Sequence, residues 1–151
     1  MVVESSTGDG QPNVGLLMYV AARSLEARAY DALVAAGADD VTPAQARLMA
    51  QIDPGGTRVV TLAARARTTK QSAAFLVDQL ERAGYVERVA DPRDGRAKLV
   101  RLTTRARAIG DRADAEVARA LGEWEEHLGP TRMRQLEESM VMLREITDPW
   151  V

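Results

Sequence analysis

The stretch TKQSAAFLVDQLERAGYVERVADPRDGRAKLVRLT, residues 69–103, decides the fold of this 151-residue chain. Its first half repeats apolar residues at spacings of three and four, which predicts an amphipathic helix that ends at Gly84. Its second half alternates apolar and polar residues over 85–89 and 98–102, on either side of the turn-rich segment 91–96. This pattern predicts a β-hairpin with a long basic tip.

Two further helices are predicted directly before this stretch. Thr42-Pro43-Ala44-Gln45 combines an N-cap hydroxyl, a Pro at the first helical position and a Gln at the third, so a helix should run to about Ile52. A short helix is expected from Val60 to about Ala66, and Thr68-Thr69-Lys70-Gln71 is predicted to be a second capping box. Two short helices joined by a tight turn and followed by a hairpin form a winged helix-turn-helix, here over residues 42–103.

Longer helices are predicted on both sides of this lobe. Apolar residues recur at helical spacing over 14–36, over 104–128 and again after Gly129-Pro130. The expected fold class is therefore mainly α with a small β-hairpin (α+β), in a single domain of residues 13–151. Residues 1–12 are rich in Gly, Ser and Asp, and we expect them to form a flexible tail.

The helices that flank the lobe are expected to join two copies of the chain. Residues 13–37 and 104–151 carry apolar faces that the small winged lobe cannot cover, which predicts a helical dimerisation region and a homodimer. The residues expected at this dimer interface are Leu17, Met133, Leu136, Met140 and Leu143.

The composition excludes several classes of function. The chain has no Cys, so disulfides, thiolate nucleophiles and Cys-ligated zinc are impossible, and the single His127 excludes a site with two imidazoles. No phosphate-binding loop or nucleophile elbow is found, so we predict no catalytic residue, no metal, no cofactor and no enzyme. No membrane span and no signal peptide are predicted, which favours a cytoplasmic protein.

The charge distribution indicates a polyanion as partner. The chain carries 20 Lys or Arg and 22 Asp or Glu, a net charge of −2. Residues 58–105 nevertheless hold 11 basic and 5 acidic side chains, a balance of +6 that leaves −8 for the rest. A basic block within the winged lobe suits double-stranded DNA, and the acidic flanks are expected to face away from it.

The second helix of the motif is expected to enter a major groove. With Leu76 at the centre of the buried stripe, the opposite face carries Gln71, Ser72, Ala74, Phe75, Asp78, Gln79 and Arg82. Gln can pair with adenine, Ser with either partner of a base pair, and an apolar ring with a thymine methyl. Lys70 lies near the helix N-terminus, where phosphate is favoured. For Phe75, packing in the core is an equally open interpretation.

The hairpin is expected to supply the second set of DNA contacts. Arg93 and Arg96 are long enough to enter a narrow minor groove, and Asp94 is expected to orient one of them through a charge-assisted hydrogen bond. Solvation explains Arg65 and Arg67 as well as a phosphate contact does. The candidate DNA-binding residues are Arg65, Arg67, Thr69, Lys70, Gln71, Ser72, Phe75, Arg93, Asp94, Arg96 and Lys98.

Five segments of this lobe share the pattern of one known family. They are Leu62-Ala63-Ala64-Arg65, Thr69-Lys70-Gln71-Ser72, the run 76–88, the segment 91–98, and Leu102-Thr103. Together they resemble the signature of MarR-type transcriptional regulators. The resemblance implies a winged-helix homodimer on a pseudo-palindromic operator, located at the nucleoid when bound. It further implies a repressor that a small aromatic or amphipathic ligand releases.

The effector site and the specificity of binding have alternative interpretations. Tyr19, Arg23 and Met49 are candidates for an effector pocket between the first two helices, although packing is the simpler role for each. The alternative to a sequence-specific regulator is a winged-helix interaction module that binds an acidic protein or RNA without sequence preference. Comparing an operator with a random duplex separates these two functions.

Overall fold

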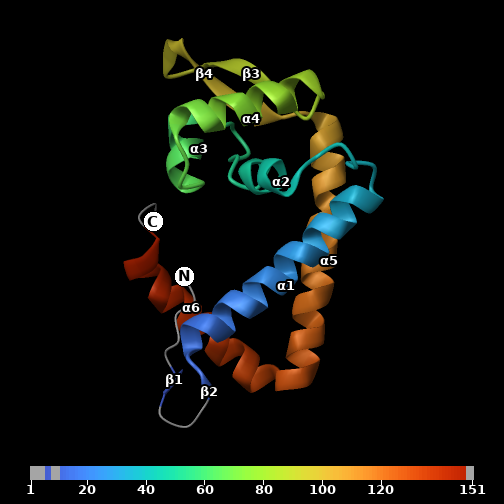
Figure 1. The fold of residues 1–151 in the computed structure, drawn as a ribbon, viewed down its shortest axis with the longest axis vertical. Coiled ribbons are helices and arrows are strands. Elements are labelled where there is room, and N and C mark those ends of the chain that lie inside the picture. Colours follow the sequence, from blue (N-terminus) through green and yellow to red (C-terminus); the bar gives the residue numbers. More distant parts are fainter. Residues whose placement is uncertain (1–5, 8–10, 149–151) are drawn as a thin grey trace.

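The computed structural model describes residues 6–7 and 11–148 as a mainly helical fold with a small hairpin, as predicted. Figure 1 shows the winged lobe at one end, with α1 and the long α5 leading away from it and α6 turning back at the far end. The elements are β1 (Ser6–Thr7), β2 (Gln11–Pro12), α1 (Val14–Ala35), α2 (Pro43–Met49), α3 (Val59–Arg65), α4 (Lys70–Arg82), β3 (Val86–Asp91), β4 (Asp94–Leu102), α5 (Thr104–Leu128) and α6 (Pro130–Thr147). Over the described ranges, no helix is both long and apolar enough to cross a bilayer.

The N-terminal segment contains regular structure that its composition did not predict. Ser6–Thr7 pairs antiparallel with Gln11–Pro12, so part of the expected flexible tail is a short two-stranded ladder. The other residues of the tail, 1–5 and 8–10, lie outside the described part of the chain. Asn13 then caps α1, because its Oδ1 accepts a hydrogen bond from the backbone N–H of Leu16 at 2.9 Å.

The capping box at the start of α2 is confirmed and also connects α2 to α4. The Thr42 Oγ1 accepts from the Gln45 N–H at 3.3 Å, and the Gln45 Oε1 accepts from the Thr42 N–H at 2.8 Å. The amide nitrogen of Gln45 then donates to Gln79 Oε1 at 3.0 Å. Gln79 is thereby turned toward α2 and lies at the edge of the face predicted for the major groove.

The predicted capping box at the start of α4 is wrong by one residue. The backbone N–H of Thr68 donates to the Ala63 carbonyl at 2.9 Å, and that of Arg67 donates to Ala64 at 3.1 Å, which closes the C-terminus of α3. Arg67 takes a left-handed backbone there, with φ 49°. Because Thr68 ends α3, Thr69 caps α4 and accepts from the N–H of Ser72 at 3.0 Å.

The hydrophobic core lies inside the winged lobe, between its helices and the hairpin. Its buried members are Ala38, Val41, Leu48, Leu62, Ala63, Ala73, Val77, Leu80, Tyr85, Val86, Val100 and Ala106. Tyr85 is the largest of them, and its hydroxyl donates to Asp40 Oδ1 at 2.5 Å. Burial and this hydrogen bond raise the pKa of Tyr85 to about 12. The Tyr85 ring is therefore buried in the core, and its hydroxyl has the hydrogen-bond partner that a buried polar group requires.

The hairpin, which we call the wing (residues 86–102), is longer and its tip is tighter than predicted. Val86 pairs with Leu102 at the base, and Asp91 pairs with Asp94 at the tip, so strand β4 begins at Asp94, four residues before the predicted start at Lys98. Thr57 adds a short bridge to β4, with N–H to O distances of 2.9 Å in both directions between Thr57 and Val100. The wing is thus anchored to the segment that leads into α3.

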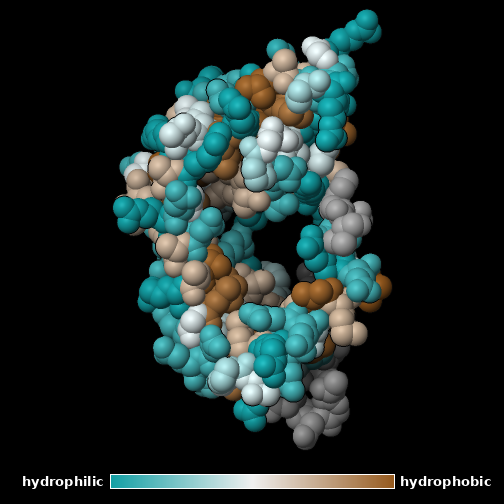
Figure 2. Space-filling model, turned by 180° about the vertical axis from the view of Figure 1, so that it is seen from behind, coloured by the Kyte–Doolittle hydropathy of each residue, from teal (hydrophilic) through white to brown (hydrophobic). Residues whose placement is uncertain are grey.

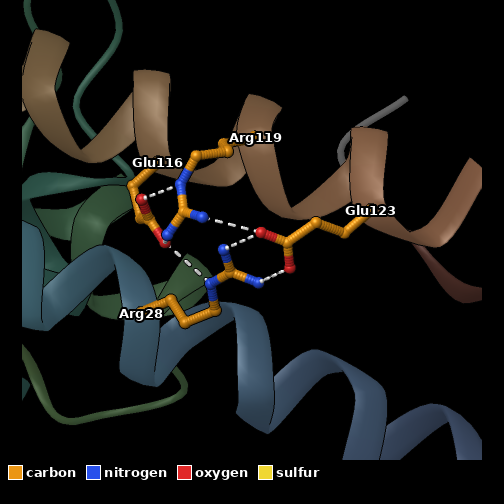
Figure 3. A network of polar contacts seen from close by, with 4 residues as sticks. All are labelled: Arg28, Glu116, Arg119 and Glu123. Carbon is orange, nitrogen blue, oxygen red and sulfur yellow. Dashed lines mark hydrogen bonds and ion pairs between the residues drawn. The ribbon is translucent and has the colours of Figure 1, made fainter. Parts of the chain in front are cut away.

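Outside the lobe, a network of four charged side chains holds α1 against α5 (Figure 3). The Arg28 guanidinium donates to Glu116 at 2.7 Å and to both oxygens of Glu123 at 2.6 and 2.9 Å. Arg119 donates to the same two carboxylates from the α5 side. Hydrogen bonds from Arg119 and Arg28 lower the pKa of the Glu116 carboxyl. The shared carboxylates set the register of the two helices that support the lobe.

The turn before α3 offers a test of how tightly the wing is anchored. Gly56 has φ +97°, and a Cβ on it would lie 3.0 Å from Leu99 Cβ and 3.2 Å from the Val100 carbonyl oxygen. We expect Gly56→Ala to lower the free energy of unfolding by about 1–3 kcal/mol, because Ala is strained at this φ and must displace β4. A Cβ on neighbouring Gly55 meets nothing within 4 Å, so Gly55→Ala should change stability by less than about 0.5 kcal/mol. Urea denaturation measures both, and equal losses would contradict the anchored turn.

Candidate nucleic-acid interface

The side of α4 that faces away from the core is open to solvent. Ala73, Val77 and Leu80 are buried against the lobe as predicted, whereas Leu76, the expected centre of the buried stripe, is only partly buried. The opposite side, which we call the outer face of α4, is exposed at Gln71, Ser72, Phe75, Asp78 and Arg82. Hydrogen-bonding groups and an apolar ring therefore lie together on one accessible helix face.

Phe75 occupies the middle of this outer face. Its side chain is not in the core, because 58% of the residue surface is exposed. The structure thereby decides between the two positions that the sequence left open. An exposed aromatic ring on a helix of this motif can contact the methyl group of a thymine.

At the N-terminus of α4, the Thr69 hydroxyl is engaged in capping the helix, whereas the Lys70 side chain is accessible to a ligand. Thr69 Oγ1 accepts the N–H of Ser72 and donates to Ser72 Oγ at 2.8 Å. These bonds occupy Thr69 in capping, which competes with its predicted contact to DNA. Lys70 is exposed at the first position of the helix, where an ammonium group and unpaired backbone N–H groups can face the same phosphate.

The wing presents three basic side chains to solvent. Arg93, Arg96 and Lys98 are exposed, and none has an ion-pair partner among residues 6–7 and 11–148. Asp94 contacts its predicted partner Arg96, but it does so through the backbone: its Oδ1 accepts from the Arg96 N–H at 3.2 Å, and its Oδ2 lies 3.5 Å from Nη2 of Arg58. The Asp94 carboxylate thus holds the turn and faces Arg58, and it forms no ion pair with the guanidinium of Arg93 or Arg96.

The residue that orients the wing is Asp91, which the sequence analysis did not select. Only 6% of Asp91 is exposed. Its Oδ2 accepts from Arg58 at 2.6 and 2.9 Å, and its Oδ1 accepts from the backbone N–H of Arg93 at 2.9 Å. These bonds, first the one from Arg93 and then those from Arg58, lower the pKa of the Asp91 carboxyl. Arg58 precedes α3, so the pair joins the wing tip to the helix-turn-helix.

A second arginine that the sequence analysis missed neutralises acidic groups on α4. Arg88, on β3, lies 2.6 Å from Asp78 Oδ1 and also forms an ion pair with Glu81. Asp78 belongs to the outer face of α4, where an unpaired carboxylate would repel DNA phosphates. The guanidinium of Arg88 therefore reduces the negative charge that α4 presents.

Arg65 is turned toward the loop before α3, whereas Arg67 is exposed in the turn between α3 and α4. The Arg65 guanidinium donates to the Gln51 carbonyl at 2.8 Å and to Asp53 Oδ1 at 2.9 Å, so it serves the loop before α3. Both arginines line a groove of about 530 Å³ near the end of α6, together with Arg144. Among the described residues, these contacts favour a structural role for Arg65.

The proposed effector residues are only partly brought together. A cavity of about 450 Å³ lies between α1, α2 and α5, and Arg23 lines it. Tyr19 is 61% exposed near the start of α1, and Met49 packs half-buried against the lobe core, so neither belongs to the cavity wall. The aromatic residue at the cavity is Tyr30, three turns after Tyr19 on the same helix. Tyr30 is held there by a hydrogen bond from its hydroxyl to the Val41 carbonyl at 2.7 Å.

Three of the five residues predicted at a dimer interface are exposed. Leu17, Leu136 and Leu143 are exposed and Met140 is half-buried, but Met133 is buried within the protomer. Met133 therefore packs at the junction of α5 and α6 and is unavailable to a second copy. Over the described residues, no group of three or more His, Asp or Glu could hold a metal ion.

Comparison with known proteins supports this architecture. Residues 39–97 match the MarR family. No curated protein shows significant similarity to the chain. Among solved structures, CouR from Rhodococcus jostii RHA1 with p-coumaroyl-CoA is 26% identical, at a TM-score of 0.68, over 92% of this chain and 94% of that one.

Two further structures have the same fold. NadR in complex with 4-hydroxyphenylacetate is 23% identical, at a TM-score of 0.68, over 94% of this chain and 99% of that one. CouR bound to a 23-mer DNA duplex aligns at 22% identity and a TM-score of 0.66, over 93% of this chain and 98% of that one. Residues 39–97 thus match the MarR family, and the chain as a whole has the winged helix-turn-helix fold of these solved structures.

Proposed function

We propose that this chain is a homodimeric transcriptional regulator that binds a two-fold-symmetric operator in duplex DNA. One observation carries this proposal. The outer face of α4 and the wing lie at the same end of the lobe (Figure 1), and the wing arginines Arg93 and Arg96 have no ion-pair partner in the described part of the chain. That CouR has been seen on a DNA duplex supports the same mode of binding. Here α4 enters a major groove and the wing follows the adjacent minor groove.

Each protomer contributes two kinds of contact. Gln71, Ser72 and Phe75 reach base edges, because they project from the exposed side of α4 near its N-terminus. Lys70, Arg93 and Arg96 contact phosphates or the minor groove and position the protein on the duplex. Sequence preference therefore comes from α4, and most of the binding free energy comes from the basic side chains.

A second copy covers the apolar surface of the helices outside the lobe. Large apolar side chains are exposed along the first half of α1 and along α6: Val14, Leu16, Leu17, Met18, Tyr19, Val20, Leu136, Val141, Met142, Leu143 and Ile146. Figure 2 shows apolar surface beside the opening between the lobe and α6. An exposed apolar surface of this extent is typical of a protein interface. Two copies related by a two-fold axis place two lobes on half-sites about 34 Å apart.

A small ligand controls occupancy of the operator. The cavity between α1, α2 and α5 joins the helices of the dimerisation region to the first helix of the lobe. A ligand that prefers one spacing of the two lobes shifts the protein toward that spacing and removes one set of DNA contacts. The bound ligands in CouR and NadR support this regulation, and loss of DNA binding makes the regulator a repressor that its ligand releases.

Salt dependence tests whether DNA binding is electrostatic in origin. With about four phosphate contacts in each protomer, eight contacts per dimer should give a slope of about −7 for log affinity against log salt concentration. Fluorescence anisotropy with a labelled duplex measures this slope. A slope near zero would contradict the proposed interface.

Arg96→Ala should weaken operator binding by about 1–3 kcal/mol and leave stability unchanged, because the side chain is exposed at the wing tip. The operator is a duplex that the protein itself selects from a random pool. Arg132→Ala is the matched control: it removes an exposed arginine of α6 at the far end of the molecule and should not affect binding. Equal affinities of wild type and Arg96→Ala would show that the wing does not contact DNA.

Sedimentation should find a dimer at micromolar concentration. Leu17→Asp should shift the equilibrium toward monomer, because it places a charge in the apolar surface of α1. Val60→Asp is the control, since Val60 is 58% exposed against 54% for Leu17 but lies on α3 in the lobe. Dissociation by both variants to the same extent, or a wild-type monomer with intact helices, would contradict the proposed interface.

A further inference from the structure

The charged side chains around the cavity between α1, α2 and α5 determine which charge its ligand can carry. This inference rests on the proposed function, in which the cavity binds an effector. Most of its wall is apolar, from the alanines of α1, α2 and α5 together with Leu33, Pro43 and Val117. Five charged side chains also line it: Arg23, Arg47, Glu26, Asp31 and Asp114. An apolar cavity favours an aromatic or aliphatic body, and these five groups decide which charge that body can carry.

The two arginines of the wall, Arg23 and Arg47, both form ion pairs with the carboxylate of Glu26. Arg47 Nη1 lies 2.6 Å from Glu26 Oε1, and Arg23 Nη1 lies 3.5 Å from Glu26 Oε2. A ligand carboxylate would have to compete with Glu26 for these guanidinium groups. Glu26 therefore compensates one of the two positive charges before any ligand enters, and the five charged side chains of the wall together carry one net negative charge.

The two aspartates of the wall lack such compensation. Asp31 on α1 and Asp114 on α5 have no ion pair with any residue in the ranges 6–7 and 11–148. They come from α1 and α5, the two helices that Arg28, Glu116, Arg119 and Glu123 hold together (Figure 3). This network therefore fixes the positions of the two aspartates relative to each other. Two uncompensated carboxylates beside an apolar wall attract a cation and repel an anion.

Tyr30 adds a third group suited to a cation. Its hydroxyl is fixed by the hydrogen bond to the Val41 carbonyl, so its ring keeps one place in the wall. The face of a tyrosine ring attracts an ammonium group within about 6 Å of the ring centroid. An aromatic ring and two carboxylates together recognise a positive charge attached to an apolar body.

We propose that this cavity takes an amphipathic organic cation, an ammonium or amidinium on an aromatic or aliphatic body, in preference to a carboxylate of the same size. The ligands in the structures of CouR and NadR are p-coumaroyl-CoA and 4-hydroxyphenylacetate, which are organic anions. This chain thus differs from them in the charge of its effector. The cation enters between the lobe and the dimerisation helices, and its binding lowers the affinity for DNA.

Three probes with one body test the charge preference directly: 2-naphthylmethyl-trimethylammonium, 2-naphthylacetate and 2-naphthalenemethanol. Isothermal titration of the full-length protein should give an affinity for the ammonium probe at least about tenfold above that for the carboxylate, with the alcohol between them. Equal or tighter binding of naphthylacetate would overturn the proposal, and so would the absence of binding by the ammonium probe.

Variants locate the site. Asp31→Asn and Asp114→Asn should each lower the affinity for the ammonium probe by about threefold to tenfold, because each removes one negative charge and keeps the shape of the side chain. Asp111→Asn removes an exposed carboxylate one turn away on α5, outside the cavity wall, and should leave the affinity unchanged. An equal effect of all three variants would show a general surface attraction and would overturn the assignment to this cavity.

Duplex binding measured without probe separates this inference from the proposed function. If the protein binds its selected duplex but not the ammonium probe, the cation site is wrong and the regulator stands. If the probe binds and depends on Asp31 and Asp114 while no duplex is bound, the proposed function is wrong and the cation site stands. When both bind, the ammonium probe should lower duplex affinity, and an unchanged affinity would contradict its role as effector.

Discussion

The ion pair between Arg58 and Asp91 is the contact on which the geometry of the winged lobe depends. It joins the start of α3 to the wing tip, and Asp91 accepts the backbone N–H of Arg93 at the same time. Thr57, next to Arg58, also bridges Val100 on β4, so the segment before α3 contacts the wing at a second point, opposite Arg88. Because α3 packs on α4, the wing and the outer face of α4 keep a fixed relative orientation, as simultaneous contact with two grooves requires.

The helices outside the lobe form a second rigid unit, and the cavity lies where the two units meet. Arg28 binds two carboxylates of α5, so α1 and α5 move together. The wall of the cavity combines these helices with α2, whose Gln45 contacts Gln79 of α4. A ligand in this cavity therefore contacts both units and can change the angle between them. A change in that angle moves α4 without disturbing the core of the lobe.

The order of the helices and strands could be predicted because caps and turns depend on neighbouring residues. Most of the predictions that were wrong depend on contacts between residues far apart in the sequence. Thr42 could be assigned as a cap because the capping box acts within four residues. Thr68 was wrongly predicted as the N-cap of α4, because its N–H instead bonds the Ala63 carbonyl at the end of α3. The tetrapeptide 68–71 alone does not reveal this bond. Asp91 and Arg58 are 33 residues apart, and no periodic pattern pairs them. Tyr30 rather than Tyr19 lines the cavity because the part of α1 in the cavity wall begins at Arg23 and ends at Leu33.

The central claim is that α4 and the wing bind duplex DNA with sequence preference. Hydroxyl-radical footprinting of the wild-type protein on a duplex selected from a random pool tests it most directly. Two protected regions centred about one helical turn apart, which disappear on a scrambled duplex of equal length, are the predicted result. Equal protection of selected and scrambled duplexes would contradict it and would indicate a basic module that binds polyanions without reading sequence.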